Sequence, residues 1–151
     1  MTRQTKLNTF LWFKTGDLDK ALTFYQSVFT DMQVHSQNRM GPGGPLFTAD
    51  FTIHGHGFIG MAWDGGPEFN DSISLSLSVD GQEEVDRLWD AITAEGSEGQ
   101  CGWCKDQFGV SWQVSPFQMR DYLENPDSAV REYANQALRK MTKIVIKDFI
   151  K

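Results

Sequence analysis

Eight residues, Ser72-Ile73-Ser74-Leu75-Ser76-Leu77-Ser78-Val79, alternate serine with an aliphatic side chain without a break. That two-residue period is typical of a strand with one apolar and one polar face. A helical pattern follows, because Asp80 and Glu83 have the spacing of a capping box and an apolar stripe runs on toward Gly96. The stripe consists of Val85, Leu88, Trp89 and Ile92. With strands expected near residues 102–105 and 109–115, this half has the order strand, helix, strands.

The N-terminal half repeats this order. Residues 7–13 are rich in aromatic side chains and predict a strand, and Asp17 is placed as the N-cap of a helix. The apolar positions of that helix are Leu18, Ala21, Leu22, Tyr25, Val28 and Phe29. Strands are then expected near residues 32–36, 46–53 and 58–63, separated by glycine-rich turns. Phe24-Tyr25 corresponds to Leu88-Trp89, and residues 57–61 correspond to 109–113, so the sequence predicts an α+β fold of two βαβββ modules.

Length and composition favour a single domain. A chain of 151 residues with 40% hydrophobic side chains can bury one good core. We predict one domain over residues 5–151, with modules at about 7–64 and 71–116 and a C-terminal extension at about 117–151. Fourteen basic and twenty acidic side chains give 14 − 20 = −6, and this charge argues against nucleic acid as a partner. The sequence shows neither a membrane-length apolar run nor a secretion signal, which predicts a cytoplasmic protein.

The C-terminal extension carries an apolar stripe with helical spacing. Its members are Val130, Tyr133, Ala134, Ala137, Leu138 and Met141. Such a stripe has to be buried, and we expect a homodimer to bury it. The alternative is that the stripe covers the chain's own barrel.

Several stretches resemble the PhnB-like family, often labelled a demethylubiquinone methyltransferase domain, of the vicinal-oxygen-chelate (glyoxalase/bleomycin resistance/dioxygenase) superfamily. They are residues 17–25, 82–86, 101–116, 125–129 and 141–144. The resemblance implies paired βαβββ modules whose sheets curl around a cup. In the superfamily's enzymes, four inward-facing residues of the cup hold a divalent metal.

Carried over to this sequence, the metal positions are Asn8, about Met61, Ser74 and Gln113. Only Gln113 is a ligand type found there, whereas a catalytic ion needs about three imidazole, carboxylate or thiolate ligands. We therefore expect neither a bound metal nor another cofactor. A shifted register that brings in a ligand such as Asp64 is the alternative.

Other motifs favour structural roles. The glycine-rich turns at 41–45 and 65–67 contain proline and the first precedes a strand pattern, so neither resembles a methyl-donor site between a strand and a helix. Cys101 and Cys104 form a CxxC motif in a predicted strand or turn, where packing is favoured over redox chemistry. His54 and His56 are expected in an exposed turn rather than in a zinc site shared with the cysteines. Asp17, Asp19, Glu83, Glu84 and Asp86 are expected on caps and solvated helix faces, and Trp89 and Trp112 in the core.

The polar sides of the predicted strands should line the cup. Alternation assigns to that side Asn8, Phe10 and Trp12; Ile59, Met61 and Trp63; Ser72, Ser74, Ser76 and Ser78; and Ser111, Gln113 and Ser115. Leu7, Leu11, Phe13, Ile73, Leu75, Leu77, Val79, Val110, Trp112 and Val114 should pack under the helices. A neutral lining of this kind suits an uncharged, flat small molecule.

We therefore expect a metal-free small-molecule-binding protein whose ligand is a neutral aromatic, quinone-like or otherwise oxygenated compound. The expected ligand contacts are Asn8, Phe10, Trp12, Met61, Trp63, Ser74, Ser111 and Gln113. One alternative is an enzyme of the same superfamily, glyoxalase- or dioxygenase-like or the labelled methyltransferase, acting on a small oxygenated substrate. Another is a dimeric domain with a vestigial cup. The sequence identifies no catalytic residue for an enzymatic function.

Overall fold

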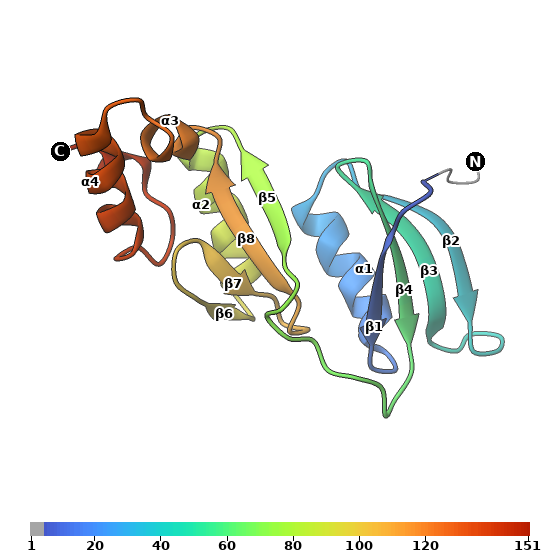
Figure 1. The fold of residues 1–151 in the computed structure, drawn as a ribbon. Coiled ribbons are helices and arrows are strands. Elements are labelled where there is room, and N and C mark those ends of the chain that lie inside the picture. The colour runs from blue at the N-terminus through green and yellow to red at the C-terminus, as the bar shows by residue number, and fades with distance from the viewer. Residues whose placement is uncertain (1–4) are drawn as a thin grey trace. The chain divides into compact units, whose positions relative to one another are not determined.

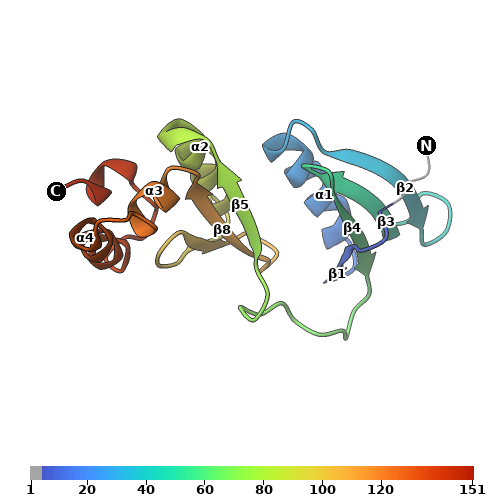
Figure 2. The same cartoon turned by 45° about the horizontal axis from the view of Figure 1, so that its top comes forward.

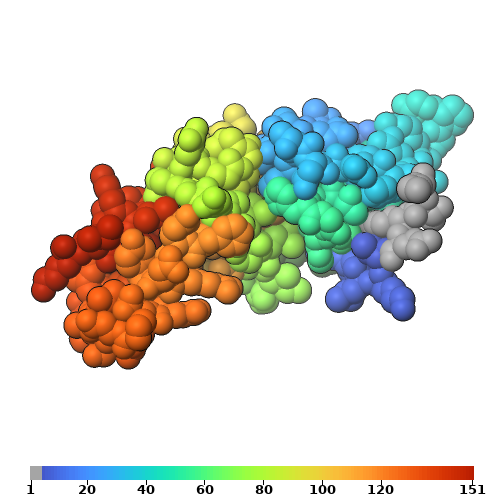
Figure 3. All heavy atoms as spheres, turned by 90° about the horizontal axis from the view of Figure 1, so that it is seen from above, coloured from blue at the N-terminus to red at the C-terminus, as the bar shows by residue number. Residues whose placement is uncertain are grey.

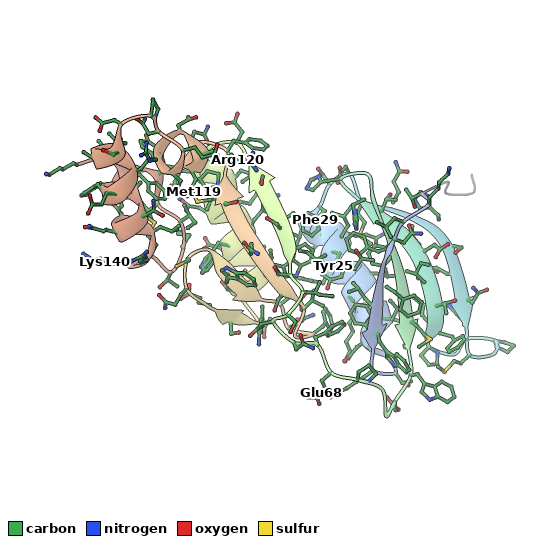
Figure 4. The ribbon with its side chains drawn as sticks, in the orientation of Figure 1. Tyr25, Phe29, Glu68, Met119, Arg120 and Lys140 are labelled. Carbon is green, nitrogen blue, oxygen red and sulfur yellow. The ribbon has the colours of Figure 1, made fainter. Side chains whose placement is uncertain are left out.

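The computed structural model describes residues 5–151, which divide into two units at Glu68 and Phe69. The first unit contains β1 (Thr9–Phe13), α1 (Asp17–Val28), β2 (Gln33–Arg39), β3 (Leu46–Ile53) and β4 (His56–Ala62). Its four-stranded sheet has the order β1-β4-β3-β2, with α1 against one side (Figure 1). Glu68, labelled in Figure 4, marks the end of this unit.

The second unit repeats this architecture with β5 (Leu75–Val79), α2 (Gly81–Thr93), β6 (Ser97–Glu98), β7 (Trp103–Lys105) and β8 (Ser111–Pro116). Its sheet has the order β5-β8-β7-β6. In each unit the first strand is parallel to the last one, and the remaining pairs are antiparallel. Figure 2 shows each helix against one side of its own sheet. The predicted α+β fold of two βαβββ modules is therefore confirmed.

The core of the first unit is a layer of aromatic rings between α1 and the sheet. Tyr25 of α1, labelled in Figure 4, stacks on Phe51 with ring centroids 6.4 Å apart. Phe51 in turn stacks on Phe58 at 5.1 Å. Gly60 of β4 lies where an added Cβ atom would run into the side chain of Leu18 on α1. A residue with a Cβ atom at this position would require the Leu18 side chain to shift, so glycine allows α1 and β4 to pack closely.

The core of the second unit surrounds two tryptophans and a buried carboxylate. Trp89 and Trp112 are each 2% exposed, which confirms their predicted place in the core. Asp106, only 3% exposed, accepts hydrogen bonds from the indole N–H of Trp112 at 2.9 Å and the backbone N–H of Val110 at 3.1 Å. A third comes from the backbone N–H of Phe108 at 2.9 Å. These donors compensate the burial of the carboxylate and fix the turn between β7 and β8.

Equivalent backbone hydrogen bonds at the strand ends show which residues of the two units correspond. The carbonyl of Phe13 accepts from Trp63 N–H at 3.0 Å, and the carbonyl of Val79 accepts from Phe117 N–H at 2.7 Å. With Phe13 equivalent to Val79, the parallel registers make Ile59 the counterpart of Gln113.

The predicted correspondence, which set Met61 opposite Gln113, is therefore wrong by two residues; the counterpart of Met61 is Ser115. It rested on matching Gly57 with Gly109. Gly57 lies inside β4, whereas Gly109 lies in the turn before β8 with a φ of 87°. A shift of two residues keeps the same face of the strand, so the assignment of faces survives.

The strands are shorter than predicted at their N-terminal ends. β1 begins at Thr9 and β5 at Leu75, and the preceding Leu7 and Ile73 are 83% and 75% exposed instead of packed under a helix. The pairing of β5 with β8 begins at Leu75 opposite Trp112, so the alternation of residues 72–74 continues beyond the paired strand. Hydrophobic alternation alone does not reveal where the neighbouring strand stops.

The helix ends also differ from the prediction. The N-cap of α1 is Gly16, with a φ of 85°, so Asp17 is the first helical residue and not the cap. Asp80 is the N-cap of α2 as predicted, but its carboxylate accepts from Gln118 Nε2 at 2.7 Å. α2 ends at Thr93, before Gly96. The two-residue strand β6 was not predicted.

The C-terminal extension folds into α3 (Met119–Leu123), α4 (Ser128–Leu138) and a 3-10 turn η1 (Ile146–Phe149). Ala134 and Met141 of the apolar stripe are buried in a cluster with Ile144 and Phe149, and Tyr122 stacks on Phe149 at 5.5 Å. Figure 3 shows the red C-terminal atoms beside the orange ones of the same extension. Ala137 and Leu138 pack against this cluster, so four of the six stripe residues are covered within their own unit, and the homodimer stays a prediction.

Side-chain and backbone hydrogen bonds fasten the extension to the second module. The carbonyls of Met141 and Thr142 accept from the N–H groups of Cys101 and Gly102, both at 2.8 Å. Lys143 forms an ion pair with Asp86 of α2 at 2.8 Å. No helix within the described part of the chain is both long and apolar enough to cross a membrane.

Candidate functional site

Each sheet has one side turned away from its helix, which we call its open face. On the first sheet, burial and strand pairing place Phe10, Trp12, Thr48, Asp50, Ile59 and Met61 on this face. On the second sheet they place Ser76, Ser78, Trp103, Lys105, Ser111, Gln113 and Ser115 there. The predicted alternation of faces is confirmed within these strands, whereas four residues of the predicted lining lie outside them: Asn8, Trp63, Ser72 and Ser74.

The first open face is largely aromatic. Trp12 donates its indole N–H to the carbonyl of Trp63 at 2.9 Å, and Phe10 and Trp63 are 54% and 56% exposed. Phe47 makes an edge contact with Trp63 at 6.1 Å between ring centroids. The side chain of Asn8, in contrast, donates to the carbonyl of Thr5 at 3.2 Å, so a local turn engages it. Exposed aromatic surface of this kind suits a flat apolar ligand.

The second open face is polar. Gln113 Nε2 donates to Ser74 Oγ at 2.8 Å, and Ser111 Oγ donates to Asp71 Oδ1 at 2.7 Å. Across the antiparallel pair β7–β8, Trp103 lies opposite Gln113 and Lys105 lies opposite Ser111. The predicted residues Ser74, Ser111 and Gln113 are therefore brought together on this face.

The predicted neutral lining is wrong in both units. Lys105 and Asp71 form an ion pair at 3.1 Å beside Ser111, and Asp50 lies on the first open face. The hydroxyl of Ser111, followed by the ammonium of Lys105, lowers the pKa of Asp71 below its ordinary value, so this carboxylate is charged at neutral pH. The sequence offered a signal for Lys105, because residues 102–105 were predicted as a strand. Its partner residues depend on the strand register, which the sequence leaves open.

A pocket of about 580 Å³ borders this part of the second open face. Its lining includes Asp71, Ser97, Cys101, Trp103, Lys105 and Ser111. The volume lies within the range of small-molecule sites, roughly 300 to 1,000 Å³. The pocket combines an aromatic surface, a hydroxyl and a charged pair, all from residues of the second unit.

The donor set does not fit the superfamily's metal ion. At the four positions implied by the resemblance, Gln113 and Ser74 are hydrogen bonded to each other, Asn8 is bonded to Thr5, and Met61 offers a thioether. Asp64, the alternative ligand, accepts from the backbone N–H of Thr15 at 3.0 Å. Among residues 5–151, no group of three or more His, Cys, Asp or Glu side chains is placed to hold a metal ion. Amide, hydroxyl and thioether groups are weak ligands for a catalytic divalent ion.

The two cysteines are free thiols in unlike environments. Cys104 faces the core, where burial first and then the charges of Asp106 and Glu98 raise its pKa to about 12. Cys101 lies in a tight turn with a φ of 58°, and its Sγ donates to the carbonyl of Leu138 at 3.3 Å. A thiol with so high a pKa is a poor nucleophile, which disfavours redox chemistry for this pair.

His54 lies in the turn between β3 and β4 as predicted, whereas His56 is the first residue of β4. His54 Nδ1 lies 2.9 Å from a carboxylate oxygen of Asp31, and His56 Nε2 lies 2.8 Å from Thr9 Oγ1. Both side chains are exposed, and each is engaged locally rather than with the cysteines.

The helical acids likewise make structural contacts. Asp19 accepts from Arg39 and from the backbone N–H of Leu46, while Glu84 pairs with Arg87.

The glycine-rich turns do not resemble a methyl-donor site. Residues 41–45 connect the antiparallel strands β2 and β3. Gly65-Gly66-Pro67 follows β4 and leads to β5, and an added Cβ atom on Gly66 would run into the ring of Trp12. Nucleotide-type cofactors are held where a glycine-rich turn leads from a parallel strand into a helix. Neither turn has that position.

The comparisons with known proteins agree on the fold. A family model described as 3-demethylubiquinone-9 3-methyltransferase matches residues 5–115. A putative 3-demethylubiquinone-9 3-methyltransferase, PhnB protein, from Bacillus cereus is 29% identical, with a TM-score of 0.65 over 74% of this chain and 99% of that chain. The extension after residue 115 lies outside the family model. A search of curated proteins found no match.

Two more distant structures share the fold. Protein PA1353 from Pseudomonas aeruginosa is 20% identical, with a TM-score of 0.62 over 75% of this chain and 98% of that chain. The fosfomycin resistance protein FosX from Listeria monocytogenes, in complex with Mn(II) and sulfate, is 16% identical, with a TM-score of 0.55 over 80% of this chain and 97% of that chain. The chain therefore belongs to the family described as 3-demethylubiquinone-9 3-methyltransferase, a PhnB-like branch of the vicinal-oxygen-chelate superfamily with the glyoxalase/bleomycin-resistance fold.

Proposed function

We propose that this protein binds a small oxygenated aromatic compound on the open face of its second sheet. The observation that carries the proposal is a pocket of about 580 Å³ lined by Trp103 and Ser111, on a face that also carries the hydrogen-bonded pair of Gln113 and Ser74. Side-chain amides and hydroxyls can both donate to and accept from a ligand oxygen. Trp103, opposite Gln113, adds an aromatic surface for stacking.

The first open face is a separate surface for ligand contacts. Phe10, Trp12, Met61 and Trp63 supply aromatic and thioether surface there, and Asn8 is the least suitable contact because its side chain is bonded to Thr5. Contacts to these five residues remain part of the predicted site. They are tested by variants of their own, since they belong to the first unit.

Binding without a metal is part of the proposal, and the weak donor set supports it. Methyl transfer, which the family description names, is not part of it. That reaction requires a site for a methyl donor, and the two glycine-rich turns at 41–45 and 65–67 lack the strand-to-helix position of such a site.

The test is an NMR titration of ¹⁵N-labelled protein with 2-naphthamide, a neutral bicyclic compound with a carbonyl group. We expect shifts of the Gln113 side-chain amide and the Trp103 indole signals. Gln113→Ala should weaken binding about fivefold, because one hydrogen bond to a ligand contributes about 1 kcal/mol. Trp12→Ala tests the first open face in the same way.

Gln26→Ala provides the matched control, because Gln26 is an exposed glutamine on α1. Equal affinity in wild type and Gln113→Ala would place the ligand elsewhere. No binding of naphthalene compounds by the wild type would refute the proposed ligand class.

A further inference from the structure

The pocket of the second unit presents a cation and an aromatic ring on one strand. Trp103 and Lys105 are two residues apart on β7, so both point to the open face. Trp103 is 36% exposed, and the side chain of Lys105 is 42% exposed. Both line the pocket of about 580 Å³.

Lys105 and Ser111 converge on a single oxygen atom. Lys105 Nζ lies 3.1 Å from Asp71 Oδ1, and Ser111 Oγ donates to the same oxygen at 2.7 Å. The two donors belong to neighbouring strands and are directly paired across them. Strand pairing holds their backbones in register, and both side chains donate to one carboxylate oxygen, the arrangement that recognises an acid.

The acceptor is held less firmly than the donors. Asp71 lies before β5, outside the strands, and its side chain is 64% exposed. An ion pair so exposed contributes little to stability, because water screens it. A carboxylate entering the pocket could take the place of Asp71 at both donors without disturbing the sheet.

We propose that the ligand of this pocket is an aromatic acid, whose carboxylate binds Lys105 and Ser111 and whose ring stacks on Trp103. Asp71 occupies the two donors in the free protein and is displaced by the ligand. This inference rests on the proposed function, since it names the ligand class for the same open face. It differs from the sequence-based expectation of a neutral ligand, because Lys105 adds a positive charge to the pocket.

The experiment compares 2-naphthoate with 2-naphthamide, which have nearly the same shape and differ in charge. In NMR titrations of the wild type, the acid should bind at least tenfold more tightly than the amide, as a charge-assisted hydrogen bond implies. Lys105→Met should abolish this preference, because the charge that distinguishes the acid from the amide is removed. Lys105→Arg should retain it, because the positive charge remains.

Asp71→Asn gives a prediction of opposite sign. Asparagine can still accept from Ser111 but no longer competes as an anion, so the variant should bind 2-naphthoate several-fold more tightly than the wild type. If Asp71 does not compete with the ligand, Asp71→Asn should bind 2-naphthoate as tightly as the wild type or more weakly, which would overturn the displacement of Asp71. If Lys105→Met does not fold, the acid-to-amide ratio of the wild type and the sign of the Asp71→Asn effect decide the question.

The outcomes separate the two proposals. Equal affinities of the wild type for acid and amide would overturn the acid preference and leave the proposed function standing. If the wild type prefers the acid and Lys105→Met binds the acid with the same affinity as the wild type, the assigned site is overturned. No binding of either compound would refute both proposals.

Discussion

Gln82 should control how firmly the C-terminal extension is attached, and its removal offers a quantitative test. Its Nε2 donates to the carbonyl of Ile144 at 2.9 Å, and its Oε1 accepts from the backbone N–H of Ile146 at 2.8 Å. One amide side chain thus pairs with two backbone groups of the tail, as a neighbouring strand would. The side chain of Ile144 is fully buried.

Gln82→Ala removes both hydrogen bonds. Each net hydrogen bond contributes about 1 kcal/mol, so the loss should be about 2 kcal/mol. If detachment of the tail is the local unfolding reaction with the lowest free energy, the population of detached molecules rises about thirtyfold. The third bond of Gln82, to Asp86 at 2.9 Å, joins two residues on the surface of one helix and adds little.

The assay is amide hydrogen exchange of Ile146, combined with urea unfolding. We expect a loss of protection at Ile146 and a lower midpoint of unfolding. Gln136→Ala is the matched control, since Gln136 is an exposed glutamine whose contact with Glu132 is a long 3.4 Å. Unchanged protection of Ile146 in Gln82→Ala would refute the assigned role of the side chain.

Three further results are expected. At pH 8 a thiol reagent should modify Cys101 in the folded protein but Cys104 only after unfolding, because a pKa of about 12 leaves about one Cys104 thiolate in ten thousand. The hydrogen bond and charge of Lys143 lower the pKa of Asp86 below its ordinary 3.8, so the pair stabilises the fold above that value and is lost as pH falls through the lowered pKa. Thermal melts at pH 6 and pH 2 should therefore differ more in the wild type than in Asp86→Asn. Asp106→Asn should cost about 1.5 to 3 kcal/mol in urea unfolding, since hydrogen bonds to a buried charge are lost, and an unchanged midpoint would contradict this.

The order of elements and the buried faces could be predicted because they depend on local periodicity. The strand predicted at residues 46–53 has the observed bounds of β3. Leu88, Trp89 and Ile92 form the buried side of α2, as expected. Strand and helix periods are written into neighbouring residues, so a single sequence reveals them. The same holds for the alternation of Leu77 and Val114 with serine and glutamine.

Register and long-range partners could not be predicted in the same way. Lys105 was within a predicted strand, but its position beside Ser111 follows from the turn at residues 106–110, where Gly109 has a left-handed φ of 87° and Asp106 accepts from two backbone N–H groups. The length and hydrogen bonding of that turn set the register, and strand alternation alone does not reveal them. The apolar stripe with Ala134 likewise predicted burial without identifying the covering residues.

The extension that lies outside the family model bears directly on the pocket. Met141 and Thr142 hold the backbone of the turn at Cys101 and Gly102, and an added Cβ atom on Gly102 would contact Ile144. This turn leads straight into Trp103, the aromatic wall of the pocket. The position of Trp103 therefore depends on a tail that Gln82 fastens from the other side, so the extension completes the second module instead of acting as a separate appendage. The matched part of the chain, residues 5–115, contains the pocket residues but not the segment that supports them.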